Sequence, residues 1–230
     1  MLDIDIYRHN EKRWSDLAYA EGTSAEGDSY DLNEKPRYAA MLALQYDLKN
    51  SDETLVRFLF EQEILAREND DYQGIGEALP LGAYLLASFK RPGDIPLFYD
   101  AKFANFDTAC GFDREYMYVA LGENTESYVL EHYPDLHEEI IDFFDKGRME
   151  SWWNRQVLDH PQKQSDEHLM TLFRRSLYFE DLAAAREFID EWRRAEPESS
   201  SKESTLKYAY KAIAECESAT FHSQNNGDED

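Results

Sequence analysis

The residues from 101 to 124, AKFANFDTACGFDREYMYVALGEN, bring together several side-chain types that perform chemistry in enzymes. Lys102, Asp107 and Asp113 carry groups that exchange protons, and Cys110 carries a thiol that can act as a nucleophile. A reactive thiolate needs a nearby base, whereas neighbouring carboxylates disfavour it. We therefore interpret this stretch as the corner between two helices, with a catalytic site as the alternative. The corner predicts three capping residues: Asp107, Gly111 and Asp113.

The sequence contains no motif for a metal ion or a bound cofactor. Its six histidines form no H-E-x-x-H or Glu-x-x-His arrangement, and its two cysteines are far apart. His132 and His137 lie across a predicted helix start, without the spacing of two ligands on one helix. Phosphate-binding patterns such as G-x-x-x-x-G-K are missing as well. We predict no catalytic residue, no metal site and no cofactor.

The charge of the chain indicates what kind of partner it attracts. Acidic residues outnumber basic ones by 48 to 24, which gives a formal net charge of -24. Phosphate backbones and anionic membrane surfaces repel such a chain, so we expect neither nucleic acid nor a membrane as its partner. The charge favours a basic protein instead. The alternative is that the acidity serves only solubility or a salt-rich habitat.

A predicted helix over residues 134–146 concentrates acidic side chains. Their spacing of i, i+3, i+7 and i+10 places them on one face, opposite Leu136, Ile140 and Phe143. Like charges at this spacing repel by a few tenths of a kcal/mol per pair, and a basic partner would relieve the repulsion. The alternative is an ordinary solvated face. The predicted acidic binding face consists of Asp135, Glu138, Glu139, Asp142 and Asp145.

Two adjacent tryptophans, Trp152 and Trp153, form a second candidate binding feature. Neighbours on a helix point about 100° apart, so both indoles are hard to bury in one core. One of them is expected at a groove or interface, where tryptophan contributes much binding energy. The alternative is that each packs on a different neighbour. A ligand groove would instead draw on the aromatic side chains of Tyr84, Tyr99, Tyr116 and Tyr118.

The pattern of apolar residues predicts an all-α fold of about ten antiparallel helices. Glycine and proline are scarce, at 10 and 7 residues, and the apolar positions recur with a helical period. Three predicted helices begin alike, at Asp94, Asp135 and Asp181, with spacings of roughly 40–47 residues. This spacing resembles that of HEAT-like units, whereas the strict tetratricopeptide pattern is absent. We expect a solenoid-like (HEAT/TPR-like) or an irregular helical array.

We divide the chain into three segments of one domain. They are an N-terminal segment and loop over 1–35, a helical array over 36–195, and 196–230 with a linker, a last helix and a mobile acidic tail. A short extended stretch is expected near the N-terminus. Two cysteines are too few for a disulfide framework, and no signal peptide or span of about 18 apolar residues is apparent. These observations predict a soluble cytoplasmic protein.

The resulting functional prediction is a non-enzymatic acidic protein that binds other proteins. We expect an immunity-type or inhibitor-type protein that neutralises a basic partner, such as a bacterial toxin, through its acidic face. The alternative is a helical-repeat adaptor or regulator that binds a peptide or small ligand in an aromatic groove. An enzyme with its site at 101–113 is the third hypothesis. The identity of the partner and the oligomeric state stay open.

Overall fold

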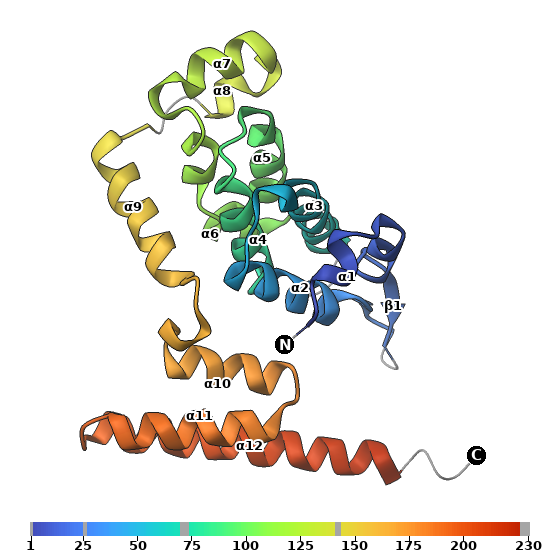
Figure 1. Ribbon diagram of the computed structural model, residues 1–230, viewed down its shortest axis with the longest axis vertical. Helices are drawn as coiled ribbons and strands as arrows, with labels where there is room; N and C mark the ends of the chain where they lie inside the picture. Colours follow the sequence, from blue (N-terminus) through green and yellow to red (C-terminus); the bar gives the residue numbers. More distant parts are fainter. Residues whose placement is uncertain (1, 25–26, 70–73, 141–143, 226–230) are drawn as a thin grey trace. The chain divides into compact units, whose positions relative to one another are not determined.

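The computed structural model describes residues 2–24, 27–69, 74–140 and 144–225 (Figure 1). The model is 74% helical, and its described residues include 12 α-helices and one small two-stranded sheet. The all-α prediction is therefore confirmed, whereas the solenoid-like arrangement and the repeat stay predictions. No helix among the described residues is both long enough and apolar enough to cross a bilayer.

The contacts within the chain define two compact units, Met1–Gln162 and Lys163–Asp230. The boundary between them lies near residue 162, whereas the segments expected from the sequence were divided at 35 and 195. The organisation as one domain stays a prediction. The end of the predicted acidic tail, at 226–230, lies outside the described residues.

The N-terminal part of the first unit differs from its sequence-based description. Helix α1 (Asp5–Arg8) occupies the stretch expected to be extended, and Arg8 in its last turn contacts the carboxylate of Asp5 at 2.9 Å. The segment over 1–35, expected to contain a loop, also contains strands β1 (Glu21–Thr23) and β2 (Ser29–Asp31), which are paired antiparallel. Helix α1 and the two strands are too short for a periodic pattern of apolar residues to reveal them.

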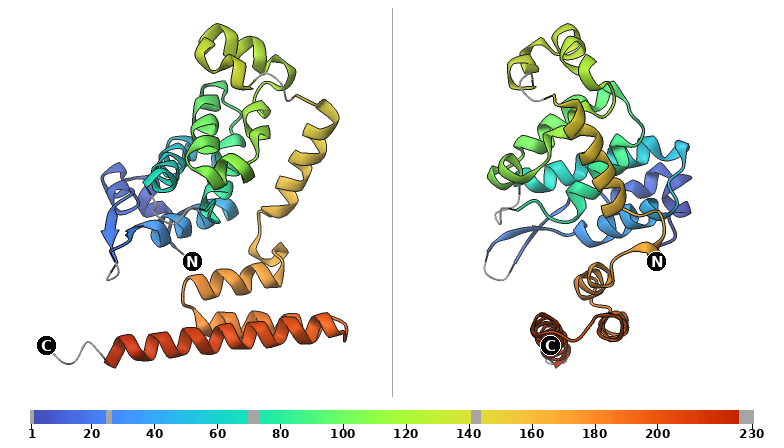
Figure 2. Two further views of the ribbon diagram at one scale, coloured as in Figure 1. Left: turned by 180° about the vertical axis from the view of Figure 1, so that it is seen from behind. Right: turned by 90° about the vertical axis from the view of Figure 1, so that its left-hand side faces the viewer.

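Helix α4 (Ala78–Ala87) lies at the centre of the first unit and is buried along its whole length. Helices α2 (Glu34–Tyr46) and α3 (Glu53–Asn69) pack against it (Figures 1 and 2). Gly82 permits this close packing, since a Cβ atom there would lie 3.1 Å from both Met41 Cε and Phe60 Cδ2. Helix α5 (Ile95–Phe103) follows and buries Ile95 and Phe98.

The rest of the first unit consists of short helices. Helix α6 (Phe106–Gly111) and a 3-10 helix at Arg114–Tyr118 follow α5. Helices α7 (Thr125–His132) and α8 (His137–Ile140) form a hairpin at one edge of the unit, and α9 (Lys146–Asp159) runs along its outside (Figures 1 and 2). The hydroxyl of Tyr118 donates to the carbonyl of Ile140 and fixes the end of α8 to the unit.

The second unit is made of α10 (Leu169–Tyr178), α11 (Leu182–Ala195) and α12 (Ser200–Asn225). Asp181 caps α11 by accepting a hydrogen bond from the backbone N–H of Ala184 at 3.0 Å. The helix predicted to begin at Asp181 is therefore present, and α12 begins early in the segment over 196–230 that was expected to contain a linker and a last helix. One small core holds the helices together, consisting of Phe173, Ala185, Ile189, Trp192, Ala209 and Ile213.

A buried ion-pair network joins the N-terminal segment to the first two long helices. Arg37 on α2 is fully buried, and its Nε donates to Glu63 Oε1 on α3 at 2.6 Å. The same guanidinium pairs with Asp31 at the end of β2 and donates to the carbonyl of Leu17 at 3.3 Å. A buried charge is tolerated only when it is paired in this way. The network therefore fixes the position of strands β1 and β2 against helices α2 and α3.

We expect Arg37→Met to lower the free energy of unfolding by about 3–5 kcal/mol, because it leaves two carboxylates buried without their cation. Arg13→Met is the matched control, since Arg13 is half exposed in its ion pair with Asp16. Arg13→Met should lower the free energy of unfolding by about 1 kcal/mol or less. Urea denaturation followed by circular dichroism measures both values, and equal losses would contradict the assigned role.

Candidate functional site

The corner between α5 and α6 is capped by Asn105, a residue that the sequence analysis did not select. Its side-chain oxygen accepts from the N–H of Thr108 at 2.9 Å, and its own N–H donates to Thr108 Oγ1 at 2.9 Å. These two bonds form a capping box. Asp107 lies in the first turn of α6, where its carboxylate faces the positive end of the helix dipole. The capping role expected of Asp107 therefore belongs to Asn105.

Gly111, predicted to cap the helix, does not have the positive φ of a left-handed glycine cap. It is the last residue of α6, and positive φ angles occur instead at other glycines, such as Gly122 with φ of 56°. A Cβ atom at Gly111 would lie 2.5 Å from Cδ1 of Ile75. A side chain at this position would therefore have to displace the end of Ile75, a close approach that the local sequence does not reveal.

Asp113 stands at the start of the 3-10 helix, but its side chain makes no capping hydrogen bond. Its Oδ2 instead accepts from the indole Nε1 of Trp152 at 2.8 Å. Trp152 is buried, and its ring meets Tyr116 edge-on with centroids 4.9 Å apart. The predicted cap and one of the predicted binding tryptophans thus form a single structural contact that holds α9 in place.

Lys102 is also used within the fold. Its Nζ donates to the carbonyl oxygen of Phe112 at 2.7 Å, and its side chain is buried. Burial lowers the pKa of Lys102, and the nearby charge of Arg114 lowers it further. The cavity beside it is only about 10 Å³, which is space for roughly one water molecule. The stretch from 101 to 113 therefore offers a set of helix-corner contacts and no room for a substrate at Lys102.

The predicted single helix over 134–146 was wrong. A 3-10 turn at Pro134–Leu136 carries Asp135, and α8 carries Glu138 and Glu139. Asp142 lies outside the described residues. Asp145 has an extended backbone and caps α9, accepting from the N–H groups of Gly147 at 3.0 Å and Arg148 at 3.3 Å. Its capping of a new helix separates it from the acidic residues of α8.

The hairpin of α7 and α8 nevertheless presents an acidic surface, which we call the acidic hairpin. Between Arg114 and Lys146 the sequence has no lysine or arginine. The surface consists of four exposed carboxylates, those of Glu126, Glu131, Asp135 and Glu138. None of the four forms an ion pair with a lysine or arginine within the described ranges, although Glu126 lies 3.8 Å from His137. Leu130 is 55% exposed among these charges.

Sequence reasoning overlooked Glu126, Glu131 and Leu130 because it searched for one periodic helix. The signal that could have found them is the long interval without a basic residue.

The histidines of this region have aromatic and acidic neighbours: His132 stacks on Tyr128 with centroids 4.1 Å apart. In the described part of the chain, no three histidine, cysteine, aspartate or glutamate side chains are grouped to hold a metal ion.

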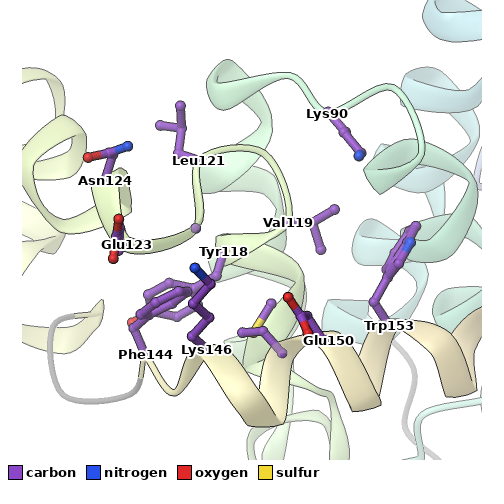
Figure 3. Close-up of a pocket in the computed structure, with 12 residues that line it drawn as sticks. Lys90, Tyr118, Val119, Leu121, Glu123, Asn124, Phe144, Lys146, Glu150 and Trp153 are labelled. Atoms are coloured by element: carbon purple, nitrogen blue, oxygen red, sulfur yellow. The ribbon is translucent and has the colours of Figure 1, made fainter.

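A pocket of about 360 Å³ opens between the end of α4, the chain around Gly122 and one face of α9 (Figure 3). Trp153 lines this pocket and stacks on Tyr84, with centroids 5.6 Å apart. The two adjacent tryptophans thus have different environments, one in the core and one at a groove. Besides Trp153, the residues that determine the charge and apolar character of the pocket are Lys90, Tyr118, Glu123, Phe144, Lys146 and Glu150.

The tyrosines expected to form a groove are largely in the interior. Tyr84, Tyr116 and Tyr118 are 8%, 2% and 2% exposed, and burial raises the pKa of Tyr116. Tyr99 packs against Phe103, with centroids 4.7 Å apart. Of the four, Tyr118 lines the pocket. A helical period cannot distinguish an aromatic core from an aromatic groove, since both lie on the inner face of a helix.

No protein-family model, no curated protein and no solved structure matches this chain.

Asp113→Ala is expected to lower the free energy of unfolding by about 1–3 kcal/mol, because it leaves the buried indole N–H without its acceptor. Asp113→Asn keeps an acceptor oxygen and should lose less. Asp107→Ala is the matched control, with a loss below about 1 kcal/mol from the helix dipole alone. Thermal and urea unfolding measure these differences, and the reverse order of the two alanine variants would refute the assignment.

Proposed function

We propose that the protein binds a basic protein partner through the acidic hairpin and neutralises it, as an immunity-type or inhibitor-type protein does. One observation carries the proposal: exposed carboxylates of α7 and α8 lie in a stretch without lysine or arginine, on an edge of the first unit. Their mutual repulsion is a cost that a basic partner would remove. The net charge of -24 would attract such a partner from a distance.

The apolar content of the same surface supports tight binding as well as fast capture. Charges at the rim of an interface mainly increase the association rate, whereas a central apolar or aromatic anchor slows dissociation. Leu130 is exposed between Glu126 and Glu131 on α7 and has the position of such an anchor. Thr125, Val129 and Ile140 are buried, and Ile140 accepts the hydrogen bond of Tyr118 that links the hairpin to the rest of the unit.

The proposal places the protein in the cytoplasm. Cys110 and Cys216 form no disulfide, and a reducing compartment would keep both as thiols. A basic toxin that acts in that compartment is the partner class we favour, because inhibition there requires fast capture at low concentration.

The experiment is affinity capture on the immobilised chain at low salt, with elution by a salt gradient and identification of the eluted protein by mass spectrometry. Its affinity is then measured by calorimetry for the wild type and two charge-matched variants. The hairpin variant combines Glu126→Gln, Glu131→Gln, Asp135→Asn and Glu138→Gln. The control variant neutralises four exposed carboxylates of the second unit by Glu187→Gln, Glu191→Gln, Glu196→Gln and Glu203→Gln.

We expect the hairpin variant to bind at least about tenfold more weakly, and the control variant to bind nearly as the wild type does. Both variants change the net charge equally, so the comparison separates a local surface from the overall field. Leu130→Ala should raise the dissociation rate with little effect on association. The toxic or enzymatic activity of the partner should be suppressed by the wild type and by the control variant. Equal weakening by both variants would refute the hairpin as the binding surface.

A further inference from the structure

The pocket beside α9 carries charges of both signs that the fold does not use. Lys90, Glu123, Lys146 and Glu150 line it, and among the described residues none of their side chains has a hydrogen bond or an ion pair. Figure 3 shows them alternating in sign along the pocket, in the order Glu123, Lys146, Glu150, Lys90. Two ammonium groups and two carboxylates therefore face one cavity, in a chain that is otherwise strongly acidic.

The apolar part of the pocket lies between these charges. Trp153, Met149 and the charged Lys146 and Glu150 occur at helical spacing, so one face of α9 supplies both the apolar and the charged lining. Tyr118 and Phe144 add two further rings, with centroids 5.7 Å apart. At about 360 Å³ the pocket falls within the range of small-molecule sites.

The backbone of Lys90 gives an independent reason to assign this residue a task. Its φ is 52°, in the left-handed region that favours glycine, and its N–H donates to the carbonyl of Ala87 at 3.0 Å at the end of α4. Glycine would occupy this position without strain. Residues with a strained backbone concentrate at functional sites, where the role of the side chain outweighs the free energy of the strain.

The mixed charge selects one class of ligand. An anion in this pocket would be repelled by Glu123 and Glu150, and a simple cation would be repelled by the two lysines. A zwitterion pairs with both signs and is not excluded by the net negative charge of the protein. The rings of Trp153, Tyr118 and Phe144 would in addition accept an apolar side chain.

We propose that this pocket binds a free α-amino acid, or the termini of a short peptide, with a large apolar side chain. Lys90 pairs with the ligand carboxylate, Glu150 pairs with its ammonium group, and Trp153 packs on its apolar side chain. The site is separate from the acidic hairpin, so the two proposals stand or fail independently.

The test is calorimetric titration of the full chain with L-phenylalanine and with the dipeptide L-leucyl-L-phenylalanine. Whichever probe binds more tightly identifies the source of the zwitterion. N-acetyl-L-phenylalanine lacks the ammonium group and L-phenylalanine amide lacks the carboxylate, so each should bind at least about tenfold more weakly than phenylalanine. Saturable binding of neither probe, or binding of either derivative as tight as that of phenylalanine, would overturn the proposal.

Two variants connect the ligand groups to the protein groups. Lys90→Gly should weaken phenylalanine at least about tenfold but leave the affinity of the amide nearly unchanged, because that ligand has no carboxylate to lose. Glu150→Gln should weaken phenylalanine and the amide, but not the N-acetyl derivative. Full affinity of Lys90→Gly for phenylalanine would refute the assigned role.

The control for backbone strain is Glu180→Gly, since Glu180 has φ of 60° and lies in the second unit. Both glycine variants should keep or raise the melting temperature, because each removes a strained left-handed residue. Only Lys90→Gly should lose ligand affinity. A lower melting temperature of Lys90→Gly would show that the lysine stabilises the fold, and would remove the strain argument for the site.

Discussion

The first unit is organised by the need to cover one helix on all sides. The sequence of α4, ALPLGAYLLA, is apolar around its whole circumference, and every one of its side chains except that of Pro80 is buried. A helix of this kind cannot lie at a surface, because each exposed face would leave apolar area in water. Gly82 lets α2 and α3 approach on one side, where Met41 and Phe60 come within van der Waals contact. The ring of Tyr84 stacks on Trp153 of α9, which covers a further part of α4.

The position of α9 follows from the same constraint. Its two adjacent indoles are both engaged, Trp152 with Asp113 and Tyr116, and Trp153 with Tyr84. The hydrogen bond from the Trp152 indole to Asp113 favours one rotation of the helix about its axis, since a buried indole N–H without an acceptor is costly. Once α9 is fixed in this orientation, the face that includes Lys146 and Glu150 lines the pocket.

The helical class and several caps could be predicted from the sequence because they depend on local patterns. Asp181 and the amphipathic period of α11 are examples, since cap and stripe lie within one helix. The pairing of Asp113 with Trp152 joins residues far apart in the chain and has no local signature. The prediction of one helix over 134–146 was wrong for a different reason. The apolar residues keep a helical period through this stretch of the sequence, but Asp145 caps the start of a new helix, α9. Periodicity indicates which residues face inward and does not indicate where a chain restarts.

The two compact units also differ in how much interior each possesses. Three helices of the second unit share a core cluster of six buried residues, of which Trp192 is still 9% exposed, whereas the first unit encloses an entire helix. Apolar burial is the main source of stability, so the two units are expected to melt separately, with the second opening at lower temperature or denaturant concentration. Each unit then has its own free energy of unfolding, and the losses expected for the Arg37 and Asp113 variants are those of the first unit. The partly opened form would retain the acidic hairpin and the pocket while its C-terminal helices are accessible to proteases.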